Sequence, residues 1–393
     1  MPRARRPIAA LACLTLLGGA LPAHADPVEG LGRVRLERVD GEAPQPMMLH
    51  DRHHTAISKL PGPTRGQIRW VADLDGAVVG SGAVDAAGRS YWATLGVGQI
   101  HVLDPDGLTV NTLLMGDGTH SSPALGRDGS VYISTLGGDL IAFEPDGRER
   151  WRHKAGREIL SSPLVDEPSG RVIFSAEDRT LGLDLRTGRL VFEYDARNGR
   201  NNSSPTLGPD GLIRITNWGG FAAAIAGSGD QVWKTPIGQH GFWASPTLGA
   251  FGTLYTAGRD GTIVALSPQG RILWHAQAPG NVSTFLGLTT YGHLIVPVAG
   301  HGVVTVSPGG VISWQLLLPG RRLSSTLSVT RDDTLYFSTY DGIIGAARIG
   351  EEELLWSVGT GEQMNSGPII APPTRGVARL YVGSRSGRVY CVE

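Results

Sequence analysis

Three histidines stand close together near the N-terminus, where they could hold a metal ion. His50, His53 and His54 surround Asp51, and imidazole nitrogens are good ligands for zinc, copper and nickel. No glutamate follows in an H-E-x-x-H arrangement, so metal-assisted hydrolysis would lack a base. The alternative is a polar leader that packs against the main domain and buries part of these rings. We favour this alternative and predict that the histidines bind no metal ion.

Other motifs that carry catalysis are missing from the sequence. It has no G-x-S-x-G motif for a nucleophilic serine and no G-x-x-x-x-G-K-[ST] loop for phosphates. Its three lysines, Lys59, Lys154 and Lys234, offer few candidates for Schiff-base chemistry. We therefore assign no catalytic residue and expect a binding protein rather than an enzyme.

Aromatic, cationic and amide side chains gather between residues 197 and 243. The stretch opens with R-N-G-R-N-N at 197–202 and closes with Q-H-G-F-W at 239–243. Tryptophan and arginine are enriched at binding hot spots, and loops on a rigid scaffold often carry function. Alternatively, these side chains pack the loops against one another. The predicted ligand contacts are Arg197, Arg200, Asn202, Trp218, His240, Phe242 and Trp243.

A repeat of about 41 residues organises the chain. The string S-S-P begins at residues 121, 161 and 203, and A-S-P follows at 244, so the steps are 40, 42 and 41 residues. A second series has the same period at positions 70, 111, 151, 192, 233, 274, 314 and 356. We interpret its aromatic members as packing residues between adjacent units: Trp70, Trp151, Phe192, Trp233, Trp274, Trp314 and Trp356. Asn111 stands at the remaining position.

Each repeat reads as four short antiparallel strands. Residues 128–152 contain three apolar or alternating runs separated by G-G and D-G turns, the pattern of hairpin-linked strands. About 40 residues per four strands is the length of a β-propeller blade. Residues 67–393 hold eight such units, with seven blades as the alternative. The last unit lacks its fourth strand, and we expect residues 67–71 to supply it and close the ring.

Composition agrees with an all-β protein. Glycine makes up 56 of 393 residues, about 14%, which disfavours helices and suits many tight turns. The hydrophobic fraction of 41% excludes a disordered chain. The formal net charge is −1, and removing three arginines with a signal peptide gives 32 − 36 = −4, so we expect no nucleic-acid partner.

The N-terminus has the pattern of a secretory signal peptide. Three arginines precede an apolar stretch over 8–21, and P-A-H-A at 22–25 supplies a cleavage site. We therefore expect a signal peptide over 1–25, a leader over 26–66 and an extracytoplasmic protein without a membrane span. Cleavage leaves Cys391 alone, so no internal disulfide can form. We expect a monomer.

Two strings carry a resemblance to a known repeat. A-L-S-P-Q-G-R-I-L-W at 265–274 and L-D-L-R-T-G-R at 183–189 resemble the PQQ-like repeat, A-L-D-x-x-T-G-x-x-x-W. That family includes quinoprotein alcohol dehydrogenases, a periplasmic outer-membrane protein assembly lipoprotein and many secreted repeat proteins. The dehydrogenases hold PQQ beneath a disulfide between adjacent cysteines, a pair that this sequence lacks.

The resemblance and the loop residues together predict a secreted or periplasmic scaffold. The propeller would recognise a protein, peptide or glycan through its loop face and would need no cofactor. The alternative is a cofactor- or metal-dependent enzyme, a quinoprotein-like oxidoreductase, that uses the central channel.

Overall fold

The computed structural model describes residues 43–393, except 44, 198, 202, 240, 243, 283 and 325. The chain divides into two units, residues 1–31 and Gly32–Glu393, and every described residue belongs to the second. The predicted signal peptide and leader residues 26–42 lie outside the described residues. Within the described part, no helix is long and apolar enough to cross a membrane.

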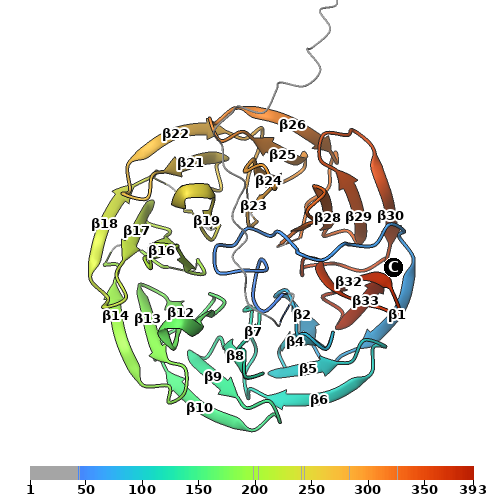
Figure 1. The fold of residues 1–393 in the computed structure, drawn as a ribbon, viewed down its shortest axis with the longest axis horizontal. Helices are drawn as coiled ribbons and strands as arrows, with labels where there is room; N and C mark the ends of the chain where they lie inside the picture. Colours follow the sequence, from blue (N-terminus) through green and yellow to red (C-terminus); the bar gives the residue numbers. More distant parts are fainter. Residues whose placement is uncertain are drawn as a thin grey trace, which may run out of the picture. The chain divides into compact units, whose positions relative to one another are not determined.

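The described residues form a ring of eight antiparallel sheets, which confirms the prediction of an eight-bladed all-β propeller (Figure 1). Seven sheets have four strands, and the first has a fifth, because its innermost part is split in two. In each blade the first strand lies nearest the ring axis and the last lies at the rim.

The first four blades follow the chain in order. Blade 1 contains β2 (Ala77–Val78), β3 (Ala83–Val84), β4 (Ser90–Leu95), β5 (Gln99–Leu103) and β6 (Thr109–Leu114). Blade 2 contains β7 (Ala124–Leu125), β8 (Val131–Ser134), β9 (Asp139–Phe143) and β10 (Glu149–Lys154). Blade 3 contains β11 (Leu164–Asp166), η1 (Glu167–Ser169), β12 (Arg171–Ala176), β13 (Arg179–Asp184) and β14 (Leu190–Asp195). Blade 4 contains β15 (Thr206–Leu207), β16 (Ile213–Thr216), β17 (Phe221–Ile225) and β18 (Gln231–Pro236).

The remaining four blades complete the ring. Blade 5 contains β19 (Thr247–Leu248), η2 (Ala250–Gly252), β20 (Leu254–Ala257), β21 (Thr262–Leu266) and β22 (Ile272–Gln277). Blade 6 contains β23 (Gly287–Leu288), β24 (Leu294–Val298), β25 (Gly302–Val306) and β26 (Ile312–Leu317). Blade 7 contains β27 (Ser328–Val329), β28 (Thr334–Ser338), β29 (Ile343–Arg348) and β30 (Leu354–Gly359). Blade 8 contains β31 (Ile369–Thr374), β32 (Val377–Gly383), β33 (Arg388–Val392) and β1 (Ile68–Asp73).

Blade 8 joins the two ends of the ring. Strand β1 pairs antiparallel with β33, so the chain segment that precedes blade 1 forms the outer strand of the last blade. Gln67 and Glu393 exchange two backbone hydrogen bonds of 3.0 and 2.8 Å. This confirms the predicted closure, and it removes the open sheet edges that an incomplete ring would expose.

Burial differs between inner and outer strands. Strands β21 and β25 are almost wholly buried, because both of their faces pack against neighbouring blades. The outer strand β22 alternates between half-buried and exposed residues, so one of its faces packs and the other meets solvent. The core is therefore a set of inter-blade layers arranged around the ring.

The tryptophans of the repeat join each blade to the next. Trp233 and Trp274 lie on outer strands, and their indole N–H groups donate to Pro268 O and Pro308 O of the following blade, both at 2.8 Å. A Cβ on Gly270 would lie 2.5 Å from the Trp233 ring, so only glycine lets the turn approach so closely. The same indole bond recurs at Trp70, Trp151, Trp314 and Trp356.

Two blades depart from this rule. Asn111 takes the tryptophan position in blade 1, and its side-chain amide donates to Asp146 O at 3.5 Å, a longer version of the indole bond. Phe192 has no N–H to donate, and its ring packs on Gly229 of the next blade. At Phe192 the contact between the two blades therefore consists of packing alone, without a hydrogen bond.

The repeated S-S-P string joins the blades near the axis. The N–H of Ser122 donates to Ser162 Oγ and that of Ser162 to Ser204 Oγ, both at 2.9 Å. Ser204 continues the series with a 2.8 Å bond to Ser245 Oγ. Because each hydroxyl accepts a backbone N–H from the preceding blade, the serines form an inter-blade belt.

Replacing Trp274 with Phe should measure one indole bond, since the change removes the N–H and keeps an aromatic ring. We expect the free energy of unfolding to fall by about 1 kcal/mol. The readout is the urea midpoint at unchanged m-value. Leu273→Ala is the control, because Leu273 is 45% exposed on the same strand, and it should change stability by less than about 0.5 kcal/mol. Equal losses in the two variants would contradict the assignment.

Candidate functional site

The up-and-down order of the strands gives the ring two faces of different make-up. The turns between first and second strands and between third and fourth strands lie on one face, here called the turn face. The links between blades and the turns between second and third strands lie on the other, here called the link face. The residues predicted to bind a ligand belong to the link face of blades 3, 4 and 5.

Three of the predicted contacts lie on the surface or near it. The side chain of Arg197 is 84% exposed and lies 3.8 Å from Asp195, and that of Arg200 is 62% exposed and lies 3.8 Å from Glu158. Exposed ion pairs of this length contribute little to stability, so both guanidinium groups remain available to a partner. Trp218 is half-buried, with the edge of its ring against Gly241.

Phe242 has a different environment from the one predicted. It is 2% exposed and packs with Ile237, Leu248 and Val264 in the core cluster of blades 4 and 5. The structure thus places this ring beneath the link face, where it supports the loops and does not meet solvent. Asn202, His240 and Trp243 lie outside the described residues.

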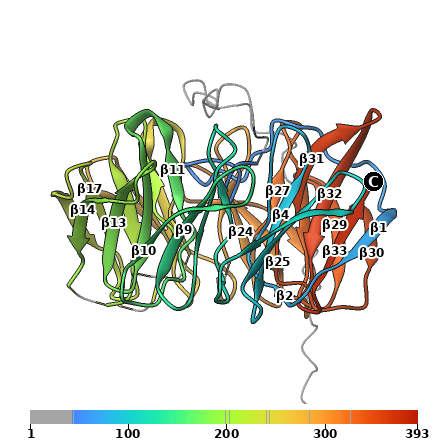
Figure 2. The same cartoon turned by 90° about the horizontal axis from the view of Figure 1, so that it is seen from below.

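Residues 45–58 cross the middle of the ring on the turn face (Figures 1 and 2). Their carbonyl oxygens accept N–H groups from the first strands of six blades, over N···O distances of 2.7–2.9 Å. The donor–acceptor pairs are Val84–Gln45, Leu125–Pro46, Leu207–Arg52, Leu248–His53, Leu288–Thr55 and Val329–Ala56. We call residues 45–58 the axial segment, because they bring one chain to the inner edges of most blades.

The axial segment is tightly folded. Leu49, His50, His54 and Ala56 all have positive φ angles, which non-glycine residues adopt only when their surroundings hold them there. Asp51 helps to hold this path, because its Oδ1 accepts the N–H groups of His53 and Thr55 at 2.9 and 3.2 Å.

The histidines of the axial segment point to different blades. His50 Nε2 lies 2.8 Å from Ser328 Oγ in blade 7, whereas His54 Nδ1 lies 3.2 Å from Pro246 O at the start of blade 5. Both rings are buried, and burial lowers the pKa of His54 to about 3. Within the described part of the chain, no group of three His, Cys, Asp or Glu side chains is arranged to hold a metal ion.

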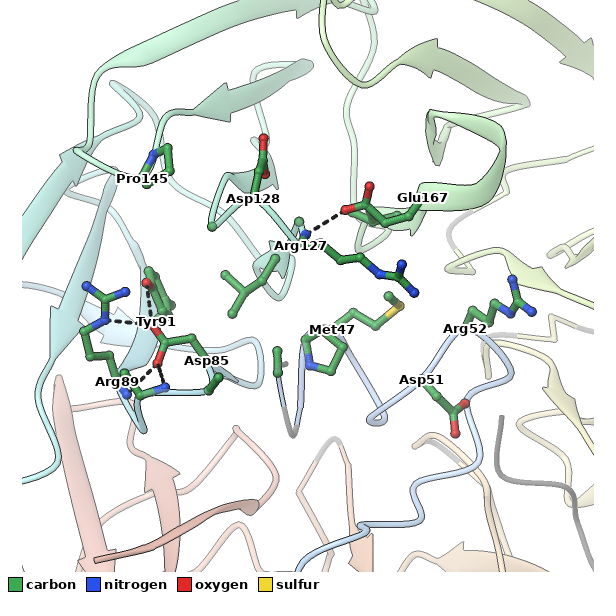
Figure 3. Close-up of a pocket in the computed structure, with 18 of the residues that line it drawn as sticks. Met47, Asp51, Arg52, Asp85, Arg89, Tyr91, Arg127, Asp128, Pro145 and Glu167 are labelled. Atoms are coloured by element: carbon green, nitrogen blue, oxygen red, sulfur yellow. Dashed lines mark hydrogen bonds and ion pairs between the residues drawn. The ribbon is translucent and has the colours of Figure 1, made fainter. Parts of the chain in front are cut away.

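A pocket of about 510 Å³ opens on the turn face between the axial segment and blades 1, 2 and 3 (Figure 3). This size lies within the range of small-ligand sites, about 300–1,000 Å³. Met47 and Pro46 of the axial segment, Tyr91 of blade 1, Leu125 of blade 2 and Val165 of blade 3 supply apolar surface.

The four carboxylates around this pocket already accept protein hydrogen bonds. Asp85 accepts from Arg89 Nε at 2.7 Å and from Tyr91 OH at 3.1 Å. Asp128 accepts from Arg150 at 2.8 Å, and Asp51 holds the axial segment as described above. Glu167 accepts the backbone N–H of Arg127 at 2.7 Å. Among the described residues, no carboxylate lies within ion-pair distance of the Arg127 guanidinium.

A smaller cavity of about 190 Å³ lies on the other side of the axial segment, toward the link face. Met48 lines it and receives a contact of 3.8 Å from Ser204 Oγ, so Met47 and Met48 border different cavities. Serines of the inter-blade belt line the walls, and Arg322 lies over the Tyr340 ring at 5.6 Å near the mouth. The axial segment therefore separates the two cavities.

The turn-face pocket could not be predicted from the sequence. Asp85 and Asp128 belong to turns that resemble those of other blades, and Glu167 begins the short 3-10 helix η1 without any motif that marks a site. The pocket exists because the axial segment passes beside these turns, a path that depends on contacts with distant parts of the chain.

Fold and repeat together define an eight-bladed propeller of the PQQ-like class. The sequence profile described as outer membrane protein assembly factor BamB matches residues 62–241 and 219–393, which cover the whole ring. The chain therefore belongs to this family.

Similar proteins include both assembly factors and enzymes. The outer membrane protein assembly factor BamB of Xanthomonas campestris pv. campestris is 26% identical over 261 residues, which span 59% of this chain and 63% of the relative, less than two thirds of its length. The crystal structure of BamB from Moraxella catarrhalis has a TM-score of 0.68 at 18% identity and covers 84% of this chain and 99% of its own. A europium-containing methanol dehydrogenase has a TM-score of 0.74 at 13% identity and covers 86% and 90%. At such identities the structural likeness concerns the fold alone.

Buried His54 should make stability depend on pH. Its pKa is about 3 in the folded protein against 6.5 for a solvated ring, so between these values the unfolded chain binds a proton that the folded chain does not. The stability that the neutral His54 ring contributes is therefore fully present above pH 6.5 and is lost as the pH falls toward 3. Between pH 7.5 and 5 the loss is about 2 kcal/mol. Burial also lowers the pKa of His101, His120 and His293, so these rings add to the loss in every variant. Urea unfolding at both pH values should therefore show a loss about 2 kcal/mol smaller in His54→Gln than in wild type, while the exposed-site control His275→Gln behaves as wild type.

Replacing Phe242 with Ala tests its position beneath the link face. We expect the free energy of unfolding to fall by about 3–5 kcal/mol, because the change leaves a cavity in the core. Arg197→Ala, in the same loop region but exposed, should change stability by less than about 0.5 kcal/mol. Chemical denaturation measures both, and a Phe242→Ala variant as stable as wild type would contradict the core position.

Proposed function

We propose that this protein is a non-catalytic propeller that acts outside the cytoplasm and binds a protein partner through its link face. Its family is named for outer-membrane protein assembly, and we infer a role in that process. The predicted signal peptide over 1–25 supports an extracytoplasmic location.

One observation carries the proposal: the protein's own chain crosses the ring axis. The axial segment is bonded to six blades and divides the axial space into two separate cavities. A quinoprotein-like enzyme would need the channel for its cofactor and substrate. The link-face loops, in contrast, keep long exposed side chains on a rigid scaffold, an arrangement that suits recognition of another protein.

The residues we propose for the contact belong to blades 3, 4 and 5. Arg197 and Arg200 supply exposed guanidinium groups that can pair with carboxylates, and Trp218 supplies aromatic surface beside them. Asn202, His240 and Trp243, outside the described residues, complete the predicted set. Phe242 supports these loops from below.

The cysteines of this chain do not fit PQQ as the quinoprotein dehydrogenases hold it. Their cofactor lies beneath a disulfide between adjacent cysteines, whereas Cys391 stands in β33 and is fully buried between β1 and β32. Burial raises the pKa of its thiol to about 12, so it has little thiolate character. Cys13, the other cysteine, falls within the predicted signal peptide.

Site-specific photo-crosslinking in the native host tests the link face. A photoreactive residue at position 200 should yield a covalent product with a protein of the outer-membrane assembly machinery. The matched control is position 186, an exposed arginine on the turn face of blade 3. Products at both positions or at neither would contradict the proposal.

A double variant and a chemical analysis complete this test. Arg197→Ala with Arg200→Ala should reduce partner recovery at least about five-fold, because arginines at interface centres often contribute more than 1 kcal/mol each. Quinone and metal analysis of protein purified from its own compartment tests the enzyme alternative. Bound quinone or a stoichiometric metal would overturn the non-catalytic assignment.

A further inference from the structure

Blade 3, like blade 8, lacks the contact that the axial segment makes with the six other blades. Of these two, blade 3 is the one whose inner strand borders the turn-face pocket. Leu125 of blade 2 and Leu207 of blade 4 donate their N–H groups to Pro46 O and Arg52 O. Between those acceptors the chain turns back on itself, with His50 N bonded to Met47 O, and it passes the inner strand of blade 3 without a backbone bond.

Val165 is the residue of blade 3 at this repeat position. It follows S-S-P by two residues, as Leu125 does, and it pairs with Val172 in the register that joins Leu125 to Val131. Its N–H therefore points toward the axis, as that of Leu125 does. Nothing among the described residues accepts it.

The turn-face pocket lies at this gap. Val165 lines it together with Met47, Leu125 and Pro168, so an acceptor that reached the Val165 N–H would lie against apolar surface. Arg127, which also lines the pocket, lies near Met47 and Glu167 in Figure 3. Two other arginines line the pocket, and each has a carboxylate beside it: Arg52 lies 3.9 Å from Asp166 and Arg89 lies 2.7 Å from Asp85. No carboxylate among the described residues pairs with Arg127, so its guanidinium is the charge on which an incoming anion can act.

We propose that the turn-face pocket binds an extended peptide segment of a partner protein. A carbonyl oxygen of that segment accepts the Val165 N–H, one large apolar side chain fills the pocket, and a neighbouring carboxylate pairs with Arg127. The segment thereby continues the series of strand-edge bonds that the axial segment makes on either side of blade 3.

The axial segment itself shows that these edges accept an extended chain. Its carbonyls meet the inner strands of six blades at 2.7–2.9 Å, and its apolar residues Met48, Leu49 and Ile57 are buried as they do so. Main-chain bonds to a strand edge, with side-chain pockets for specificity, are a common mode of peptide recognition. The proposed site lies on the face opposite the link face and does not depend on the partner proposed above.

Fluorescence anisotropy with defined peptides tests the proposal on the full mature chain. The probes are labelled octapeptides of Gly and Ser that carry one Leu and one Glu at each spacing from one to four residues, with matched peptides in which Gln replaces Glu. We expect saturable binding of at least one Glu peptide below 1 mM. Its Gln counterpart should bind about three- to five-fold more weakly, the value of one exposed ion pair.

Two variants locate the binding. Arg127→Gln should abolish the difference between Glu and Gln peptides. Val165→Pro removes the N–H and puts a ring of similar size in place of the valine side chain, a change that a strand edge tolerates. It should weaken both peptides about five-fold. Arg186→Gln on the same face and the link-face pair Arg197→Ala with Arg200→Ala should bind as wild type does, which separates this site from the proposed function.

Several results would overturn the proposal. No saturable binding by any probe would do so, including the case in which residues 26–42 of this chain already fill the pocket. A Glu preference that persists in Arg127→Gln, or wild-type affinity in Val165→Pro, would place binding elsewhere. Circular dichroism and the urea midpoint of each variant establish that it is folded.

Discussion

A propeller leaves the inner edge of every blade facing its axis, and this structure depends on how those edges are satisfied. Each first strand is hydrogen-bonded on one side only, so its remaining N–H groups need acceptors in a space closed to most solvent. The axial segment supplies them for six blades with carbonyls from a single run of fourteen residues, 45–58. It accepts positive φ angles at four positions to do so, which implies that the bonds outweigh the backbone strain.

The outer part of the ring follows a second rule, which requires only local information. An indole N–H on one blade meets a turn carbonyl on the next, and the turn carries glycine where the ring approaches. Asn111 preserves the N–H without the ring, and Phe192 preserves the ring without the N–H. The contact therefore has two separable parts, polar and apolar, and each blade boundary retains at least one of them.

These two rules explain which features of the fold could be predicted from the sequence. The D-G turns and the 41-residue period depend on residues near one another in the chain, so blade number, strand order and ring closure could all be predicted. The axial segment could not be placed, because its contacts join residues such as His50 and Ser328, which are 278 positions apart. The burial of Phe242 could not be predicted for a related reason. In the sequence, an aromatic residue in a loop looks the same whether it faces solvent or packs beneath the loop, and in the structure Phe242 packs with Ile237 and Leu248.

The axial segment also gives the two faces different chemistry. On the link face it leaves a small cavity walled by belt serines, whose hydroxyls already accept backbone N–H groups from neighbouring blades. On the turn face it forms one wall of a larger, more apolar pocket and leaves the inner edge of blade 3 without an acceptor. Because the segment is fixed to blades on both sides of this gap, the opening is held in shape by the same bonds that satisfy its neighbours. A ligand there would meet an edge already in place, and its affinity would not be reduced by the cost of ordering that edge.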